Sequence, residues 1–263
     1  MKILCLHGCA QSGQVFQAQL GAAIGIVESS RTGVSFDFID TPTQCVEFSI
    51  NERAIYKAHE WLATKLEGDG PYDGVIGFSQ GAALISSYLL YHQWYNHEHD
   101  PPFRFATFIS GSISLAVLKN LGVPVPRAAE RVVEEMDLRR RENLGPLPSH
   151  ASLARQAMFN SDDCFGLNLN KVPLELKIRI PTVHIWGTED PGFPAAIHLA
   201  GLCDPYIRKI YAHDGAHKVP QGKEDTEQLS QLVLWYMQQA IWPGDLPAWT
   251  NIVSRLSKSS TNP

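Results

Sequence analysis

The chain has 263 residues, of which 44% are hydrophobic and 19% charged, with a formal net charge of −5. These values are ordinary for a soluble globular protein, and the mild negative charge without a basic patch disfavours nucleic acid as a partner. The five cysteines are odd in number and lack the C-x-x-C spacing of a zinc site. We therefore expect reduced thiols, as in an intracellular protein.

The chain begins with a short apolar run, MKILCL, which is followed at once by the polar stretch HGCAQSGQ. This pattern makes a poor signal peptide and is too short to span a bilayer. It is read as a buried strand of a cytoplasmic protein without a membrane segment.

Further apolar runs alternate with helical patterns along the chain. Buried strands are predicted at residues 3–6, 34–39, 72–78, 103–109, 182–186 and 207–211, and helices at residues 52–66, 80–94 and 226–241. Strands that alternate with helices require crossover connections, and this predicts an α/β, doubly wound, mostly parallel sheet.

Residues 112–180 interrupt this alternation, because they contain no clear strand. A stretch of this length within a compact domain is usually functional. We interpret it as a lid or cap inserted above the sheet of a single domain that spans residues 1–263, although a solvated pair of helices would leave the same pattern. The polar residues 254–263 are predicted to form a flexible tail.

The stretch GVIGFSQGAAL places Ser79 between a predicted strand and a predicted helix. Gly-x-Ser-x-Gly in this context is typical of a nucleophile elbow, in which a sharp turn exposes the serine hydroxyl at the carboxyl end of the sheet. The small residues Gly77 and Gly81 would let the strand and the helix approach closely. The alternative is a tight turn that merely tolerates a serine.

A serine nucleophile needs a base and an acid, which follow it along the chain in this architecture. Asp190 in GTEDP follows one predicted strand, and His217 in GAHKVP follows the next. Glu189 and His213 lie beside them and remain competitors. Other carboxylates have no clear strand end before them and are read as surface or turn residues: Asp162, Asp163, Asp204 and Asp214.

Acyl transfer also needs hydrogen-bond donors for the oxyanion. The N–H of Gln80, directly after the serine, and an N–H of the loop LHGCAQSG, from Cys9 or Ala10, are the candidates. Cys9 could itself act as a nucleophile, but no histidine is placed as clearly for it. A histidine cluster is read as a solvated helix end and not as a metal site: His92, His97 and His99.

Together, LHGCAQSG, GFSQGAAL, GTEDP and GAHKVP resemble the α/β-hydrolase superfamily and, more narrowly, the fungal-type serine hydrolase (FSH) family. The resemblance extends from residue 1 to about residue 241. It implies an α/β-hydrolase fold, a triad of Ser79, Asp190 and His217, and an oxyanion hole of the Cys9 and Gln80 N–H groups. It implies no metal or other cofactor.

The family includes esterases and free-standing thioesterase-like hydrolases of fungal polyketide pathways. The resemblance therefore implies a serine hydrolase of an ester or thioester with a hydrophobic or polyketide acyl group, and a polyketide synthase carrier domain as a partner. Acyl transfer, carbon–carbon bond cleavage and a non-catalytic binding module are the alternatives. Candidate substrate contacts, each of which could instead be a core residue, are Ala10, Phe16, Phe165 and Phe193.

Overall fold

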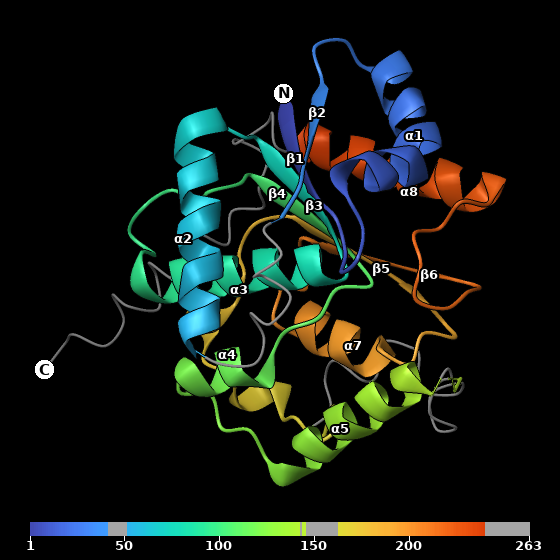
Figure 1. Cartoon of the computed structure of the whole chain (residues 1–263). Helices are drawn as coiled ribbons and strands as arrows, with labels where there is room; N and C mark the ends of the chain where they lie inside the picture. Colours follow the sequence, from blue (N-terminus) through green and yellow to red (C-terminus); the bar gives the residue numbers. More distant parts are fainter. Residues whose placement is uncertain (42–51, 143, 146–162, 240–263) are drawn as a thin grey trace, which may run out of the picture.

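A parallel sheet forms the centre of the molecule (Figure 1). The computed structural model describes residues 1–41, 52–142, 144–145 and 163–239; the predicted tail and Asp162 lie outside these ranges. The six strands have the order β2-β1-β3-β4-β5-β6, and every pairing is parallel. They are β1 (Lys2–Leu6), β2 (Ser35–Ile39), β3 (Gly74–Phe78), β4 (Phe105–Ile109), β5 (Thr182–Gly187) and β6 (Arg208–His213). The predicted parallel α/β sheet is confirmed.

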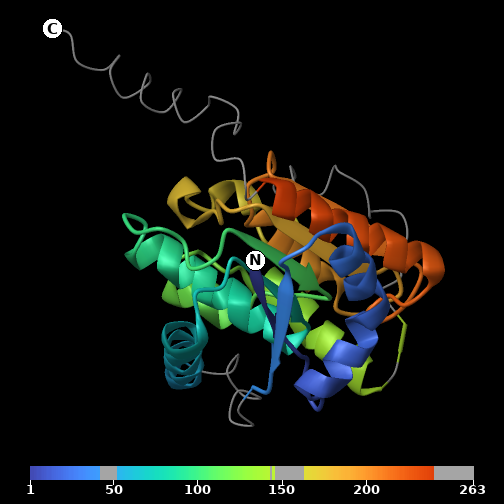
Figure 2. The ribbon, with the colours of Figure 1, turned by 90° about the horizontal axis from the view of Figure 1, so that it is seen from above.

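Helices cover both faces of this sheet, as Figures 1 and 2 show. Helices α1 and α8 pack together on one face, and the other long helices lie on the opposite side. The α-helices are α1 (Gly13–Ser30), α2 (Glu52–Asp69), α3 (Gln80–Tyr95), α4 (Leu115–Asn120), α5 (Arg127–Arg141), α7 (Phe193–Gly201) and α8 (Lys223–Gln239).

Alternate residues of the strands supply two separate cores. In β1, Ile3 and Cys5 belong to the core beneath α1 and α8, whereas Leu4 and Leu6 belong to the core beneath α2 and α3. Successive side chains of a strand point to opposite faces, so a strand covered on both sides reads as a continuous apolar run.

Outside residues 112–180, two helices were not predicted from the sequence. Helix α1 contains Gly21 and Gly25, which weaken a helical pattern, although Ser12 caps its first turn by accepting a hydrogen bond from the Val15 N–H. Every residue of α7 is buried, so this helix has no polar face that would reveal its period.

The described part of residues 112–180 is helical and contributes no strand to the sheet. It includes α4, α5 and two short 3-10 helices, η3 (Leu169–Lys171) and η4 (Leu174–Leu176). Lys119 of α4 pairs with Glu130 of α5 at 2.5 Å. Gly166 lies against the backbone of Ala129, where a Cβ atom would collide, so the segment around Gly166 packs closely on α5.

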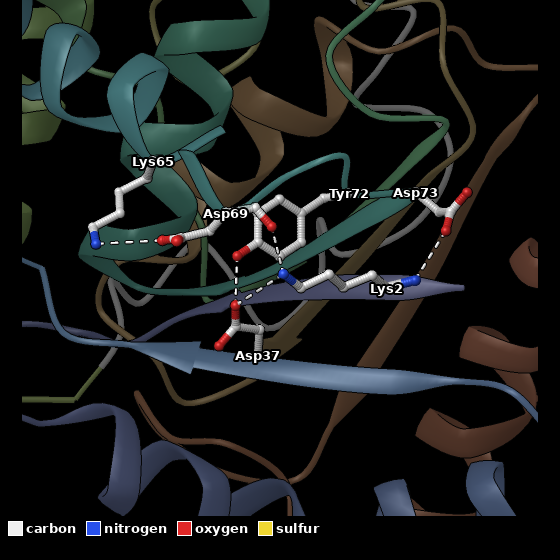
Figure 3. Close-up of polar contacts among 6 residues, drawn as sticks. All are labelled: Lys2, Asp37, Lys65, Asp69, Tyr72 and Asp73. Atoms are coloured by element: carbon white, nitrogen blue, oxygen red, sulfur yellow. Dashed lines mark hydrogen bonds and ion pairs between the residues drawn. The ribbon is translucent and has the colours of Figure 1, made fainter. Parts of the chain in front are cut away.

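A polar cluster joins β1 and β2 to the turn before β3 (Figure 3). The Tyr72 hydroxyl donates to Asp37 at 2.5 Å, and the Lys2 ammonium lies 3.6 Å from the same carboxylate and 4.4 Å from the centre of the Tyr72 ring. Lys2 also donates through its side chain to the Asp69 carbonyl and through its backbone to Asp73. These contacts hold the edge strand β2 in register with the centre of the sheet. Within the described ranges, no helix is long and apolar enough to cross a membrane.

Candidate active site

Ser79 occupies a strained turn between β3 and α3. Its φ of 51° and ψ of −110° lie outside the regions that non-glycine residues ordinarily adopt. The turn is held at both sides, because the Ser79 N–H donates to the Ile109 carbonyl and its carbonyl accepts from the Ala83 N–H, each at 2.9 Å. Strain that is maintained in this way is characteristic of functional sites.

The two glycines of the motif allow this turn to form. A Cβ atom on Gly77 would lie 2.6 Å from the Ala82 nitrogen, and one on Gly81 would lie 2.7 Å from the His7 carbonyl oxygen. Strand β3, helix α3 and the end of β1 therefore approach one another more closely than any other residue type at these positions would permit. This close approach agrees with the sequence interpretation.

Ser79, His217 and Asp190 are connected by hydrogen bonds. The Ser79 Oγ lies 2.7 Å from His217 Nε2, and His217 Nδ1 lies 2.7 Å from Asp190 Oδ2. Ser79 follows β3, Asp190 follows β5 and His217 follows β6, so parallel strands bring residues 138 positions apart to one edge of the sheet. With the Nδ1 proton donated to Asp190, Nε2 is free to accept the serine proton.

The carboxylate of Asp190 is 1% exposed and is stabilised in its ionised form. Burial acts to raise its pKa, but the hydrogen bond and charge of His217, the charge of Arg140 and the N–H of Gly192 together hold the pKa below its ordinary value. The Gly192 N–H donates to Oδ1 at 2.7 Å, which leaves Oδ2 for His217. Asp190 is therefore an anion that faces the imidazole.

Glu189 and His213, the sequence alternatives to Asp190 and His217, take no part in these two hydrogen bonds. Glu189 is exposed, whereas His213 is buried and its pKa is lowered, mainly by that burial. Two other carboxylates accept hydrogen bonds within local turns, Asp163 from the Gly166 N–H and Asp204 from the Tyr206 N–H. Asp214, the remaining candidate carboxylate among the described residues, is exposed.

The loop after β1 lies beside the serine. A Cβ atom on Gly8 would be 3.2 Å from the Ser79 Cβ, so the backbone that leads to Cys9 passes directly over the turn. Ala10 has a φ of 58°, and both Cys9 and Ala10 are exposed. Gln80 is the first residue of α3, where N–H groups point out of the helix end.

His7 organises this loop, a role that sequence analysis missed. Its Nδ1 lies 2.7 Å from the Gly8 carbonyl, and its Nε2 accepts from the Thr41 N–H at 3.1 Å. Because a backbone N–H can only donate, Nε2 carries no proton and Nδ1–H donates to Gly8. The position of His7 at the end of a predicted strand, next to a glycine, was the only signal in the sequence.

The aromatic candidates for substrate contact are mostly core residues. Phe16 is fully buried and stacks on Phe78 at 6.2 Å, on the face of the sheet that carries α1. It belongs to the core beneath α1 and α8, and the Phe78 ring on which it stacks lies 5.4 Å from the His217 ring. Phe193 is 1% exposed and packs edge-on against Trp186. Phe165 is half-buried and contacts Phe193 edge-on.

In the described part of the chain, no group of three or more histidine, cysteine, aspartate or glutamate side chains is arranged to hold a metal ion. Cys9 is an exposed free thiol, and Cys5, Cys164 and Cys203 are buried free thiols.

Solved structures with this architecture are α/β hydrolases. The chain superposes with a TM-score of 0.50 on mouse alpha/beta hydrolase domain-containing protein 10, at 14% identity and with 90% of each chain covered. It superposes equally on the esterase RhEst1 from Rhodococcus sp. ECU1013, at 18% identity and with 90% of each chain covered. At these identities the likeness shows the fold, which is the α/β-hydrolase fold.

A family model described as Serine hydrolase (FSH1) matches residues 1–60 and 50–229, and the chain belongs to this family. It is similar to the esterase alnB of Emericella nidulans, with 28% identity over 92% of this chain and 99% of that protein. It is also similar to the hydrolase FUB4 of Gibberella moniliformis, with 25% identity over 89% and 97%. The esterase tropF of Talaromyces stipitatus is 28% identical over 89% and 82%. The protein is therefore a serine hydrolase.

Proposed function

We propose that this serine hydrolase cleaves a carboxylic ester or thioester through a catalytic triad of Ser79, His217 and Asp190. The observation that carries the proposal is the unbroken pair of 2.7 Å contacts from the Ser79 hydroxyl through the imidazole to the buried carboxylate. A serine hydroxyl is a weak nucleophile at neutral pH, and a base positioned in this way activates it.

In the first half of the reaction, the Ser79 oxygen attacks the acyl carbonyl while His217 Nε2 takes the hydroxyl proton. Asp190 stabilises the imidazolium that forms and holds the ring in the required orientation. The imidazolium then protonates the leaving alcohol or thiol, and the acyl group remains bound to Ser79. In the second half, His217 takes a proton from a water molecule as its oxygen attacks the acyl-enzyme. The imidazolium then returns this proton to the Ser79 oxygen as the acid leaves.

The oxyanion that develops in each half-reaction needs fixed donors. We assign this role to the backbone N–H groups of Cys9 and Gln80, because the loop after β1 passes over Ser79 and Gln80 begins α3. Each such donor stabilises the transition state by about 2.7–4 kcal/mol in enzymes of this kind. The partial positive charge at the α3 N-terminus acts in the same direction.

The acyl group is proposed to be hydrophobic, as in a polyketide chain. Trp186 on β5 and Phe193 at the start of α7 form an aromatic cluster on either side of the Asp190 loop, and Phe165 of the insertion extends it with a half-buried ring. An insertion that adds apolar surface beside the triad suits a lid over such a chain. A polyketide held as a thioester on a carrier domain is the substrate class that we infer from the family resemblance.

The first experiment tests the nucleophile. Purified protein and a Ser79→Ala variant are treated with a fluorophosphonate probe and assayed with p-nitrophenyl butyrate. We expect probe attachment at Ser79, located by peptide mass spectrometry, and a loss of about 10³-fold or more in kcat for the variant. A Ser79→Ala variant with most of the wild-type activity would refute the proposal, as would labelling at Cys9.

The second experiment tests the substrate class. Matched acyl chains of increasing length are offered as p-nitrophenyl esters and as N-acetylcysteamine thioesters, and the products are identified by mass spectrometry. Hydrolysis of long thioesters supports the thioesterase proposal. Turnover of short esters alone contradicts it and leaves a carboxylesterase, and a transferred acyl group or a cleaved carbon–carbon bond would identify a different reaction at the same serine.

A further inference from the structure

Arg140, near the end of helix α5 in the insertion, reaches the loop that carries Asp190. Its guanidinium occupies the space in which a Cβ atom on Gly192 would lie. The Oδ1 atom of Asp190 is 3.0 Å from that same point. The guanidinium and the carboxylate are therefore neighbours across Gly192, and a Cβ atom at this position would displace the guanidinium.

The adjacent arginines of α5 have different partners. Arg139 pairs with Glu135 at 2.8 Å and donates to the Gly145 carbonyl at 2.9 Å, and Arg141 donates to the Asp137 carbonyl at 3.2 Å. Arg140 reaches the loop after β5, where its guanidinium lies beside Gly192. Figure 1 shows α5 next to α7, the helix that follows this loop. Because α5 and the loop belong to different parts of the chain, the contact of Arg140 links the insertion to the triad.

The two oxygens of Asp190 have separate tasks. Oδ2 faces His217, and Oδ1 accepts from the Gly192 N–H on the side from which Arg140 approaches. The carboxyl group is buried, so few water molecules compete for it. A cation beside Oδ1 favours the rotamer in which Oδ2 points at the imidazole, and a charge within about 4–6 Å also favours the ionised carboxylate.

We propose that Arg140 is a positioning residue for the triad acid, so that the seating of helix α5 on the Asp190 loop adjusts the activity of the catalytic serine. This inference rests on the proposed triad. In this role Arg140 touches no reacting atom and acts only through the orientation of Asp190. An alternative role, binding of an anionic part of the substrate by the exposed guanidinium, gives different kinetics and is decided by the same experiment.

The test compares Arg140→Gln, Arg140→Lys and a matched control, Arg141→Gln, which removes the neighbouring charge from the same helix. Each is also made in an Asp190→Asn background, and kcat and KM are measured with p-nitrophenyl butyrate. A partly exposed charge contact is worth little, so we expect Arg140→Gln to lower kcat about two- to fivefold with KM unchanged. Arg140→Lys should fall nearer to the wild type, and Arg141→Gln should equal it.

In the Asp190→Asn background, Arg140→Gln should cause no further loss, because a residue that acts through the carboxylate has nothing left to act on. An equal loss in that background, a change confined to KM, a loss no greater than that of Arg141→Gln, or no loss would each overturn the inference. Fluorophosphonate labelling of Ser79 separates this result from the parent proposal. If the wild type labels normally and Arg140→Gln has wild-type kcat, only the role of Arg140 is refuted; if Ser79 does not label, the triad itself is refuted.

Discussion

The buried histidine His59 makes a prediction about how the stability of this fold depends on pH. Its Nε2 lies 2.8 Å from the Ser87 Oγ, which joins α2 to α3, and the rings of Tyr88 and Tyr91 stand edge-on to it at 5.4 and 5.0 Å. Among the residues that the structure describes, no carboxylate is bonded to this ring, and burial lowers its pKa from 6.5 to about 4. The folded protein therefore holds His59 neutral.

The direction of the effect follows from this difference. The unfolded chain binds a proton at its ordinary pKa, whereas the folded chain resists it until about pH 4. The contribution of His59 to the free energy of unfolding is thus fully present above pH 6.5 and is lost as the pH is lowered from 6.5 towards 4. The full shift corresponds to about 3 kcal/mol in the free energy of unfolding, of which about 2 kcal/mol is lost between pH 7.5 and 5.

Urea denaturation of the wild type and of His59→Gln at pH 7.5, 6 and 5 measures this loss. The glutamine amide can donate to or accept from Ser87 but does not titrate, so the variant keeps a hydrogen-bonding group at this position and removes the titration. The free energy of unfolding of the wild type minus that of His59→Gln should decrease by about 2 kcal/mol from pH 7.5 to pH 5. Other buried histidines titrate equally in both proteins and cancel. Parallel stability curves for the two proteins would refute the reasoning, because His59 would then titrate alike in both states.

Two further predictions concern the backbone around Ser79. Gly81→Ala places a Cβ atom 2.7 Å from the His7 carbonyl oxygen and nearer still to that of Leu6, and should lower both the melting temperature and the esterase activity. In the control, Gly21→Ala, the added Cβ atom meets no neighbouring atom within 4 Å. This control should stabilise the helix by about 0.5–1 kcal/mol in urea denaturation. Equal effects at the two glycines would contradict this. His7→Ala removes the hydrogen bond to the Gly8 carbonyl and should displace the loop that carries a proposed oxyanion donor. Such donors act only in the transition state, so kcat should fall about ten- to a hundredfold with little change in KM. An unchanged kcat would show that the loop keeps its shape without the ring.

Much of the fold could be read from the sequence because its signals are local. A strand buried on both faces is a short apolar run, and each of the six runs became a strand of the parallel sheet. Helix α1 was not predicted because Gly21 and Gly25 obscure its helical pattern, and α7 was not predicted because it is buried on all sides. In both cases packing against the sheet outweighs what the local pattern shows.

The candidate site divides in the same way. The sequence alone singled out Ser79, Asp190 and His217 as the proposed nucleophile, acid and base, each after a strand end, because a nucleophile elbow needs glycines at fixed spacing and parallel strands deliver their carboxyl ends to one edge. Only the tertiary structure decided that Asp190 and not Glu189 is buried against His217, that Phe16 belongs to the core, and that Arg140 meets Asp190 across Gly192. These outcomes depend on which of two adjacent side chains points inward and on which distant helix packs against a loop. No local spacing encodes either, since both are set by how the whole chain fills space.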